Sequence, residues 1–232
     1  MWYRFAKENQ KGSLHIFDVD ETLLKTTAKI LVRSKIDNSI LYELTNQQFN
    51  DYNLGENEYY DFSQFEQAEK LKESEPIVPM IRKLKAIYRN IQKNPNSRMI
   101  INTARADFDD KDTVLEYFRS LGIPIDQMHI ERAGNLPGNI SPAFKKNEIL
   151  RNKYLTEGHN YKKVYFYDDS TTNLDVFKQL QQEHPDVEFL PIHVQHGGST
   201  RKWDDKYRQE VLTKQKEEAV EPEQDQEEAP KI

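Results

Sequence analysis

The sequence contains no cysteine, which excludes disulfide bonds, thiolate metal ligands and cysteine nucleophiles. No apolar stretch approaches the roughly 20 residues that a membrane span needs. The first residues, MWYRFAKENQKG, lack the apolar segment of a signal peptide. Lysine and arginine form no long run, so the charge pattern gives no support for broad nucleic-acid binding. These absences predict a cytoplasmic protein with no membrane partner.

Charged residues make up 31% of the sequence, and the hydrophobic share of 36% lies below the globular average. Much of the formal net charge of -6 falls in residues 209–232, which are rich in glutamate and glutamine and poor in apolar side chains. Such a segment buries too little surface to offset the entropy lost on ordering. We therefore predict an acidic disordered tail over 209–232.

Short apolar runs, rich in β-branched and aromatic residues, alternate with helical patterns along the chain. Runs this short are typical of buried parallel strands. The predicted strands are 14–17, 99–101, 128–130, 164–167 and 187–190. The predicted helices, in which apolar residues recur every three or four positions, are 78–92, 112–121, 145–154 and 174–182. This alternation predicts a doubly wound α/β sheet.

Residues 25–75 break the alternation. Two apolar runs, 30–32 and 40–42, flank a polar turn and predict a β-hairpin. A polar segment follows that contains the aromatic residues Tyr52, Tyr59, Tyr60, Phe62 and Phe65. We interpret 25–75 as an insertion over the active face, and 1–24 together with 76–208 as the catalytic core.

The strongest chemical signal is Asp18-Val19-Asp20-Glu21-Thr22, directly after the first predicted strand. In open α/β sheets, ligands bind at the carboxyl ends of the strands, where both carboxylates can face one crevice if the chain turns there. An isolated pair of aspartates more often caps a helix or begins a turn. The apolar strand before this pair and the Thr-Leu-Leu after it favour a chemical role.

These residues resemble the first motif, D-x-D-x-T, of the haloacid dehalogenase (HAD) superfamily. Three further motifs follow in the family's order: Thr103 resembles the second-motif hydroxyl, Lys145 or Lys146 the third-motif lysine, and Asp168-Asp169 the acidic fourth motif. The resemblance covers roughly residues 12 to 195 without the insertion. It implies a three-layer Rossmann-like HAD fold with a parallel sheet and a small insertion, a cap or flap, after the first strand.

The resemblance also implies a Mg²⁺-dependent phosphomonoester hydrolase. Asp18 would attack phosphorus and form an aspartyl-phosphate, while Asp20 would protonate the leaving oxygen and then deprotonate the attacking water. Mg²⁺ would be held by Asp18, the Asp20 backbone carbonyl and Asp169. Asp168 would be an alternate ligand or would support the ligands from behind.

The remaining motif residues are expected around the phosphate. Thr22 would bind substrate. Thr103 would donate its hydroxyl to a phosphate oxygen, and it is equally suited to capping the next helix. Lys145 would supply positive charge to the nucleophile and the phosphate. We prefer it to Lys146 because Phe144 precedes it and a helical pattern follows it.

Arg105 bears on the substrate. Thr103-Ala104-Arg105 resembles a second-motif variant of the phosphatase domain of phage polynucleotide kinase, which implies that Arg105 grips a phosphate. The alternative is a pairing with Asp107 or Asp109. Asn173 is expected either to order the metal-site loop or to cap a helix. A looser similarity links the insertion to HAD-like proteins of tailed bacteriophages.

The substrate is predicted to be a phosphate ester, with a nucleotide or nucleic-acid end as one candidate. Aromatic side chains of the insertion can stack on bases, although aromatic residues more often pack a fold together. A small-metabolite phosphatase, a phosphotransferase and a non-catalytic HAD-like binding protein are the alternatives. A receiver domain is disfavoured because the acidic pair comes last along the chain.

Two features have no assigned role. His193 and His196 are either a metal-binding pair or ordinary loop histidines, and the second reading is favoured. The sequence has no G-x-x-x-x-G-K motif, so an ATP-driven kinase is not expected. Nothing in the sequence indicates the oligomeric state.

Overall fold

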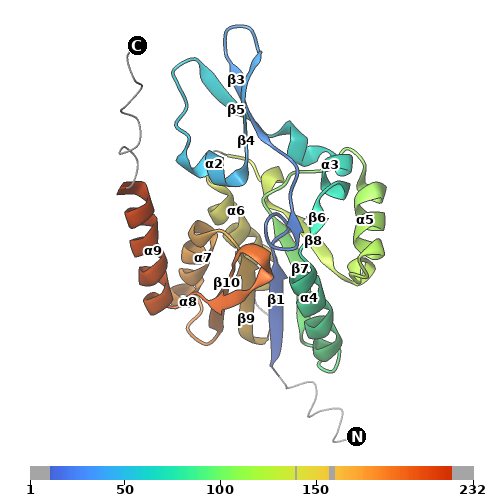
Figure 1. The fold of residues 1–232 in the computed structure, drawn as a ribbon. Coiled ribbons are helices and arrows are strands. Elements are labelled where there is room, and N and C mark those ends of the chain that lie inside the picture. Colours follow the sequence, from blue (N-terminus) through green and yellow to red (C-terminus); the bar gives the residue numbers. More distant parts are fainter. Residues whose placement is uncertain (1–10, 139, 157–159, 221–232) are drawn as a thin grey trace, which may run out of the picture.

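The computed structural model describes residues 11–138, 140–156 and 160–220. In this part of the chain, the central sheet has six strands in the order β11-β10-β9-β1-β7-β8 (Figure 1). All neighbouring pairs are parallel except β10 and β11. The strands are β1 (Gly12–Phe17), β7 (Arg98–Thr103), β8 (His129–Arg132), β9 (Tyr161–Asp168), β10 (Glu188–Val194) and β11 (Thr200–Lys202). The predicted α/β class is confirmed, with all five predicted strands present.

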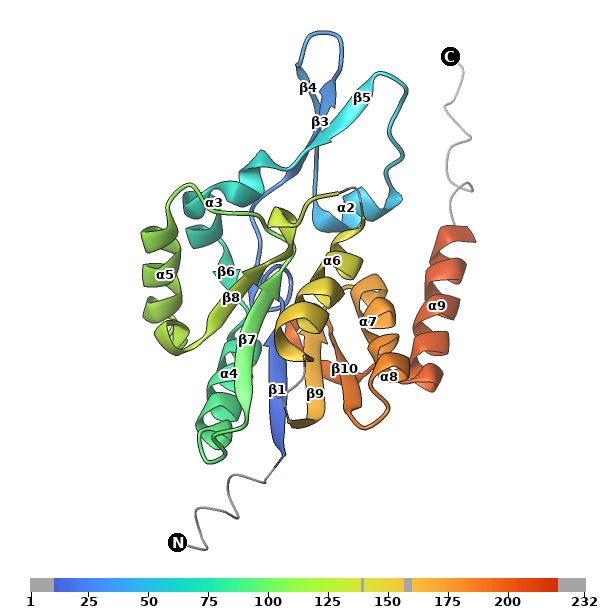
Figure 2. The ribbon, with the colours of Figure 1, turned by 180° about the vertical axis from the view of Figure 1, so that it is seen from behind.

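Helices cover both faces of the sheet, which makes three layers (Figures 1 and 2). One face packs against α4 (Val78–Ile91) and α5 (Lys111–Ser120). The other packs against α6 (Pro142–Ile149), α7 (Thr171–Lys178), α8 (Leu180–Glu183) and α9 (Asp205–Val220). Side chains of β1 alternate between the two cores: Phe17 enters the first, and Leu14 and Ile16 enter the second. Burial on both faces explains why the inner strands β1, β7 and β9 are rich in apolar residues.

Helix boundaries follow local signals. Asp110 caps α5 by accepting from the amides of Asp112 and Thr113, and Gly122 ends the helical stretch with φ +71°. Helix α6 begins at Pro142, three residues before the predicted start, because proline suits the first turn of a helix. A π-helical turn, Leu150–Tyr154, completes the predicted 145–154 segment.

The insertion is tied to the core by a two-residue ribbon. Strand β2 (Leu24–Lys25) pairs antiparallel with β6 (Glu75–Pro76), so both ends of the insertion leave the core at one place. Between them lie β3 (Ile30–Ser34), β4 (Ile40–Leu44), α2 (Asn46–Asp51), β5 (Glu58–Asp61), a 3₁₀ turn (Ser63–Glu66) and α3 (Ala68–Lys72). The predicted hairpin is β3–β4, and β5 adds on the other side of β3. Figure 1 shows this unit beyond the carboxyl ends of the central strands.

The C-terminal prediction needs correction. Helix α9 runs to Val220, so the expectation of disorder is wrong for residues 209–220, and residues 221–232 lie outside the described part. The start of α9 is anchored by Tyr207, which is buried in the second core, and Val211 packs against the same core. Among the described residues, no helix has the length and apolarity to cross a membrane.

Candidate functional site

Most of the predicted site residues come together at the carboxyl edge of the sheet. Asp18 follows β1, Thr103 ends β7, and Asp168 ends β9 with Asp169 directly after it. Because β1 lies between β7 and β9 in the sheet, these three strand ends are neighbours. This is the edge at which open α/β sheets bind their ligands.

A tight turn after β1 sets the positions of both motif aspartates. The Val19 carbonyl accepts from the amides of Thr22, Leu23 and Leu24, so the chain coils sharply after the strand. Glu21 takes a left-handed conformation with φ +56°, an uncommon geometry for a residue other than glycine. This turn keeps Asp18 buried at the strand end while Asp20 stays partly accessible.

The lysine of the site is Lys146, which corrects the preference for Lys145. The Lys146 Nζ donates to Asp18 Oδ1 at 2.7 Å and to Asp168 Oδ2 at 2.9 Å, and the residue is only 2% exposed. Lys145 Nζ instead donates to the carbonyl of Leu136 at 2.6 Å. Lys146 lies on the buried face of α6 together with Ala143, Asn147 and Ile149, whereas Lys145 is only partly buried.

Asp168 is held in place by its neighbours. Its Oδ1 accepts from the Ser170 amide at 2.9 Å, and the Asn173 side-chain amide donates to both of its carboxylate oxygens. The predicted loop-ordering role of Asn173 is therefore what the geometry shows, and the cap of α7 is Ser170. With Lys146 on Oδ2 as well, Asp168 is suited to support other groups rather than to hold a ligand itself.

Asp18, Asp168 and Asp169 offer carboxylate oxygens that all lie within 4.8 Å of one another. The Asp169 carboxylate accepts a long hydrogen bond from Thr22 Oγ1 at 3.4 Å and one from its own backbone amide, so other residues hold it less firmly than they hold Asp168. Three carboxylates face one ammonium group, an excess of negative charge that a divalent cation would balance. The donor set, all oxygen, matches the ligands that Mg²⁺ prefers.

The pKa values reflect this crowding. Burial raises the pKa of Asp18 to about 7, with Asp168 and Asp20 adding to the rise and Lys146 opposing it. Burial also raises the pKa of Asp169 well above its usual range, and the neighbouring carboxylates of Asp168 and Asp18 act in the same direction. Burial alone would lower the pKa of Lys146, but the two carboxylates beside it raise it. Lys146 is therefore charged, and the carboxylates of Asp18 and Asp168 both accept hydrogen bonds from its single ammonium group.

Arg105 pairs with a different carboxylate from those predicted, and contacts neither Asp107 nor Asp109 through an ion pair. Its side chain is 1% exposed. Its Nε and Nη2 grip both carboxylate oxygens of Asp20, at 2.9 and 2.6 Å. Its remaining contacts go to the insertion, with Nη1 donating to the Phe65 carbonyl and Nη2 to Thr26 Oγ1. Arg105 thus orients Asp20 and ties it to the insertion.

The other predicted phosphate-binding hydroxyls are also engaged. Thr22 is fully buried and its hydroxyl donates to the Asp169 carboxylate. It therefore contacts the carboxylate cluster of Asp18, Asp168 and Asp169 rather than an open surface. Thr103 Oγ1 accepts from the amide of Arg105, which shapes the loop after β7. Gly134 lies against this loop, where a Cβ atom would come within 2.6 Å of the Ala106 nitrogen. That close approach requires glycine.

Two residues support the site in a way that the sequence analysis did not assign to them. Asn102 is buried, and its side-chain amide donates to the Lys146 carbonyl at 3.2 Å, which fixes α6 against β7. His193 contacts the backbone of Asp169. The available signal was the same for both: a polar side chain near the carboxyl end of an otherwise apolar parallel strand.

The remaining predictions concern the histidines and the insertion aromatics. Both ring nitrogens of His193 have hydrogen-bond partners, and His196 lies exposed, so the two do not form a metal pair. Tyr52, Tyr60 and Phe65 pack around the apolar core of the insertion formed by Ile30, Val32 and Leu44. Phe62, in contrast, is 46% exposed. Most of these aromatic side chains therefore stabilise the fold of the insertion.

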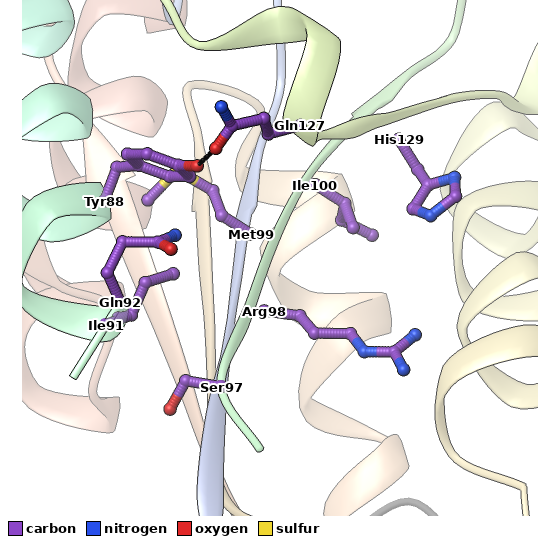
Figure 3. Close-up of a pocket in the computed structure, with 9 residues that line it drawn as sticks. All are labelled: Tyr88, Ile91, Gln92, Ser97, Arg98, Met99, Ile100, Gln127 and His129. Carbon is purple, nitrogen blue, oxygen red and sulfur yellow. Dashed lines mark hydrogen bonds between the residues drawn. The ribbon is translucent and has the colours of Figure 1, made fainter. Parts of the chain in front are cut away.

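A separate pocket lies at the other end of the sheet (Figure 3). It has a volume of about 280 Å³ and is lined by residues of α4, the first half of β7, the start of β8 and Gln127 just before β8. Arg98 and His129 are among them, and none of the site residues is. It lies at the amino end of β7, opposite the edge that carries Thr103.

No protein-family model matches this chain, and no curated protein matches it.

Proposed function

We propose that this protein is a Mg²⁺-dependent phosphomonoester hydrolase of the HAD type, with Asp18 as the nucleophile. The observation that carries the proposal is the buried group of Asp18, Asp168, Asp169 and Lys146 at the carboxyl ends of β1 and β9. A carboxylate nucleophile, an ammonium group and a surplus of acidic oxygens are the parts that phosphoryl transfer through an aspartyl-phosphate requires.

The residues divide the chemistry between them. An Asp18 carboxylate oxygen attacks phosphorus while the ester P–O bond breaks, and Asp20 gives its proton to the leaving oxygen. Water then attacks the aspartyl-phosphate, Asp20 takes a proton from that water, and inorganic phosphate and free Asp18 are released. The two-point grip of Arg105 orients the Asp20 carboxylate for taking the proton from water. For the acid step, the Asp20 oxygen that carries the proton gives up one of these two hydrogen bonds.

Mg²⁺ would be held by the Asp18 and Asp169 carboxylates and the Asp20 backbone carbonyl. When bound, it relieves the repulsion between an anionic nucleophile and an anionic phosphate. Lys146 also contributes positive charge at Asp18. Asp168 holds Lys146 and leaves the more open carboxylates for the ion.

The proposed substrate is a small phosphate ester or a single terminal phosphate of a nucleotide or nucleic acid. The insertion carries ten acidic and six basic residues between positions 25 and 75, which disfavours contact along a polyanionic strand. Its packed aromatics leave Tyr42 and Phe62, which are 53% and 46% exposed, as candidates for stacking. This observation shifts the balance toward small esters.

The test is hydrolysis of an aryl phosphate, with and without Mg²⁺, by wild-type protein and by Asp18→Asn. We expect turnover that needs Mg²⁺, an acid-stable and alkali-labile phosphoenzyme in the wild type, and neither in the variant. A parallel panel should compare a sugar phosphate, a nucleoside monophosphate and a 3′-phosphorylated oligonucleotide. Full activity of Asp18→Asn, or full activity in excess EDTA, would refute the mechanism.

A further inference from the structure

His193 lies between the carboxylate cluster of Asp18, Asp168 and Asp169 and helix α9. It stands opposite Asp168 in the β9–β10 register, one strand away from the acidic pair. Its Nε2 is 3.1 Å from the backbone carbonyl oxygen of Asp169, and its Nδ1 is 2.8 Å from the hydroxyl of Tyr207 on α9. One ring therefore joins the start of α9 to the loop that carries Asp169.

The chemistry of the partners fixes the direction of each hydrogen bond. A carbonyl oxygen can only accept, so the His193 Nε2 carries a proton and donates to Asp169. The Gln195 side-chain amide donates to the Tyr207 hydroxyl oxygen at 2.8 Å, while its Oε1 accepts from Ser199 at 2.9 Å. Tyr207 is then free to donate its own proton to His193 Nδ1. Four side chains thus form one directed chain that ends on the Asp169 backbone.

Tyr207 is held firmly enough to orient the imidazole. The residue is 4% exposed, and its ring makes an edge contact with Trp203 at 5.4 Å between centroids. The Arg201 guanidinium lies 4.0 Å over the same ring. The backbone amide of Tyr207 also donates to Asp204 Oδ1 at 2.9 Å. Packing on several sides and a cap at the helix start leave the hydroxyl little freedom.

Asp169 depends on its backbone for its position. Asp168 has three partners from other residues on its carboxylate, whereas the Asp169 carboxylate has a long bond from Thr22 and one from its own backbone amide. We propose that His193, held by Tyr207, positions Asp169 to bind the Mg²⁺ ion, so that the start of α9 is a working part of the site. This inference rests on the proposed function for the identity of the ion.

The test measures Mg²⁺ affinity by calorimetry on the full chain, independent of catalysis. Tyr207→Phe keeps the ring and removes the hydroxyl, and His193→Ala removes the link to Asp169. Supporting partners of metal ligands typically contribute about 10–100-fold in affinity, so we expect each to weaken Mg²⁺ binding about 10-fold. His193→Gln, which restores an amide donor, should recover part of the loss.

The matched control is Arg201→Ala, which removes packing from the same tyrosine ring but leaves the hydrogen-bond chain complete. We expect its melting temperature to fall about as far as that of Tyr207→Phe, with Mg²⁺ affinity within about twofold of wild type. Equal weakening in Arg201→Ala and Tyr207→Phe would reduce the chain to general packing and overturn the proposal. Unchanged affinity in both Tyr207→Phe and His193→Ala would overturn it as well.

A second readout needs no metal. Nitrogen-15 NMR of the metal-free protein should show His193 with its proton on Nε2, and Tyr207→Phe should shift the Nδ1 signal. A proton found on Nδ1 alone would contradict the inference. Wild-type protein that binds Mg²⁺ but hydrolyses no phosphate ester would refute the proposed function while leaving the positioning role supported. Wild-type protein that binds no Mg²⁺ would overturn the inference.

Discussion

At the scale of single residues, two adjacent lysines occupy different surroundings. Lys146 is buried and bridges Asp18 and Asp168. Lys145 is partly buried and donates to the backbone carbonyl of Leu136. An ammonium group next to the nucleophile stabilises the charge that develops during transfer, and loss of one such donor costs roughly 10²–10³ in rate. Lys145 makes no such contact with Asp18.

We therefore expect Lys146→Met to lose about 10²–10³ of the kcat for an aryl phosphate, and Lys145→Met to stay near wild type. Steady-state kinetics on both variants gives the comparison, and circular dichroism checks that Lys146→Met is folded. Similar rates for the two variants would show that the buried ammonium has no part in the reaction.

Arg105 gives a second prediction at this scale. A lysine in its place keeps the charge but cannot grip both oxygens of Asp20. Because the Arg105 side chain has almost no exposed surface, Arg105→Lys should lower kcat roughly 10-fold or more, through a misdirected proton donor, and leave KM nearly unchanged. A large rise in KM at constant kcat would instead support the direct phosphate contact predicted from the sequence.

At the scale of elements, the insertion has two parts. Helix α3 belongs to the main core through Ala68 and Leu71, while strands β3 to β5 close over a small core of their own. Leu31 and Asp61 are antiparallel partners, so a short turn can join them directly. The three-stranded unit can therefore be removed without cutting into the sheet that carries the site.

Replacing residues 32–60 with an Asn-Gly turn should leave a folded core. Hydrolysis of an aryl phosphate is expected to stay within roughly 10-fold of wild type, since the catalytic residues keep their partners. The differences in kcat/KM among the sugar, nucleotide and oligonucleotide substrates should become smaller. A single substitution, Phe62→Ala, serves as the companion variant for its exposed ring. If the deletion abolishes aryl phosphate hydrolysis in a protein with native circular dichroism, the unit contributes to chemistry rather than selection.

At the scale of the whole molecule, the acidic cluster couples stability to pH. Burial raises the pKa of Asp18 to about 7 in the metal-free protein, whereas the unfolded chain titrates near its ordinary value of 3.8. Between these two values, the folded state holds a proton that the unfolded state releases. The contribution of Asp18 to the free energy of unfolding therefore falls as pH rises through this window.

Asp18→Asn cannot titrate, so it should lack this decline. In EDTA, the melting temperature of Asp18→Asn relative to wild type is expected to increase from pH 5 to pH 8. Thermal denaturation at the two pH values, with His196→Asn as a control at an exposed histidine outside the cluster, measures the effect. A difference that stays constant with pH would mean that Asp18 is ionised across the whole range.

The sequence indicated the strands, and with them the edge where the chemistry lies. The apolar runs that end at Asp18, Thr103 and Asp168 are local patterns, and parallel pairing brings their ends together for any sheet of this kind. The sequence did not indicate which side of α6 faces the core. The packing of α6 against the sheet buries Ala143, Lys146, Asn147 and Ile149, and this packing decided which of two lysines points inward.

What the sequence determined by itself was the α/β class, the insertion and the aspartate nucleophile candidate, because periodicity and motif spacing are properties of neighbours along the chain. Tertiary structure alone decided that Arg105 grips Asp20, that Lys146 meets Asp18, and that His193 joins Tyr207 to Asp169. These contacts span 85, 128, 14 and 24 residues along the chain. Side-chain partners at such separations depend on how whole elements pack, which no local pattern encodes.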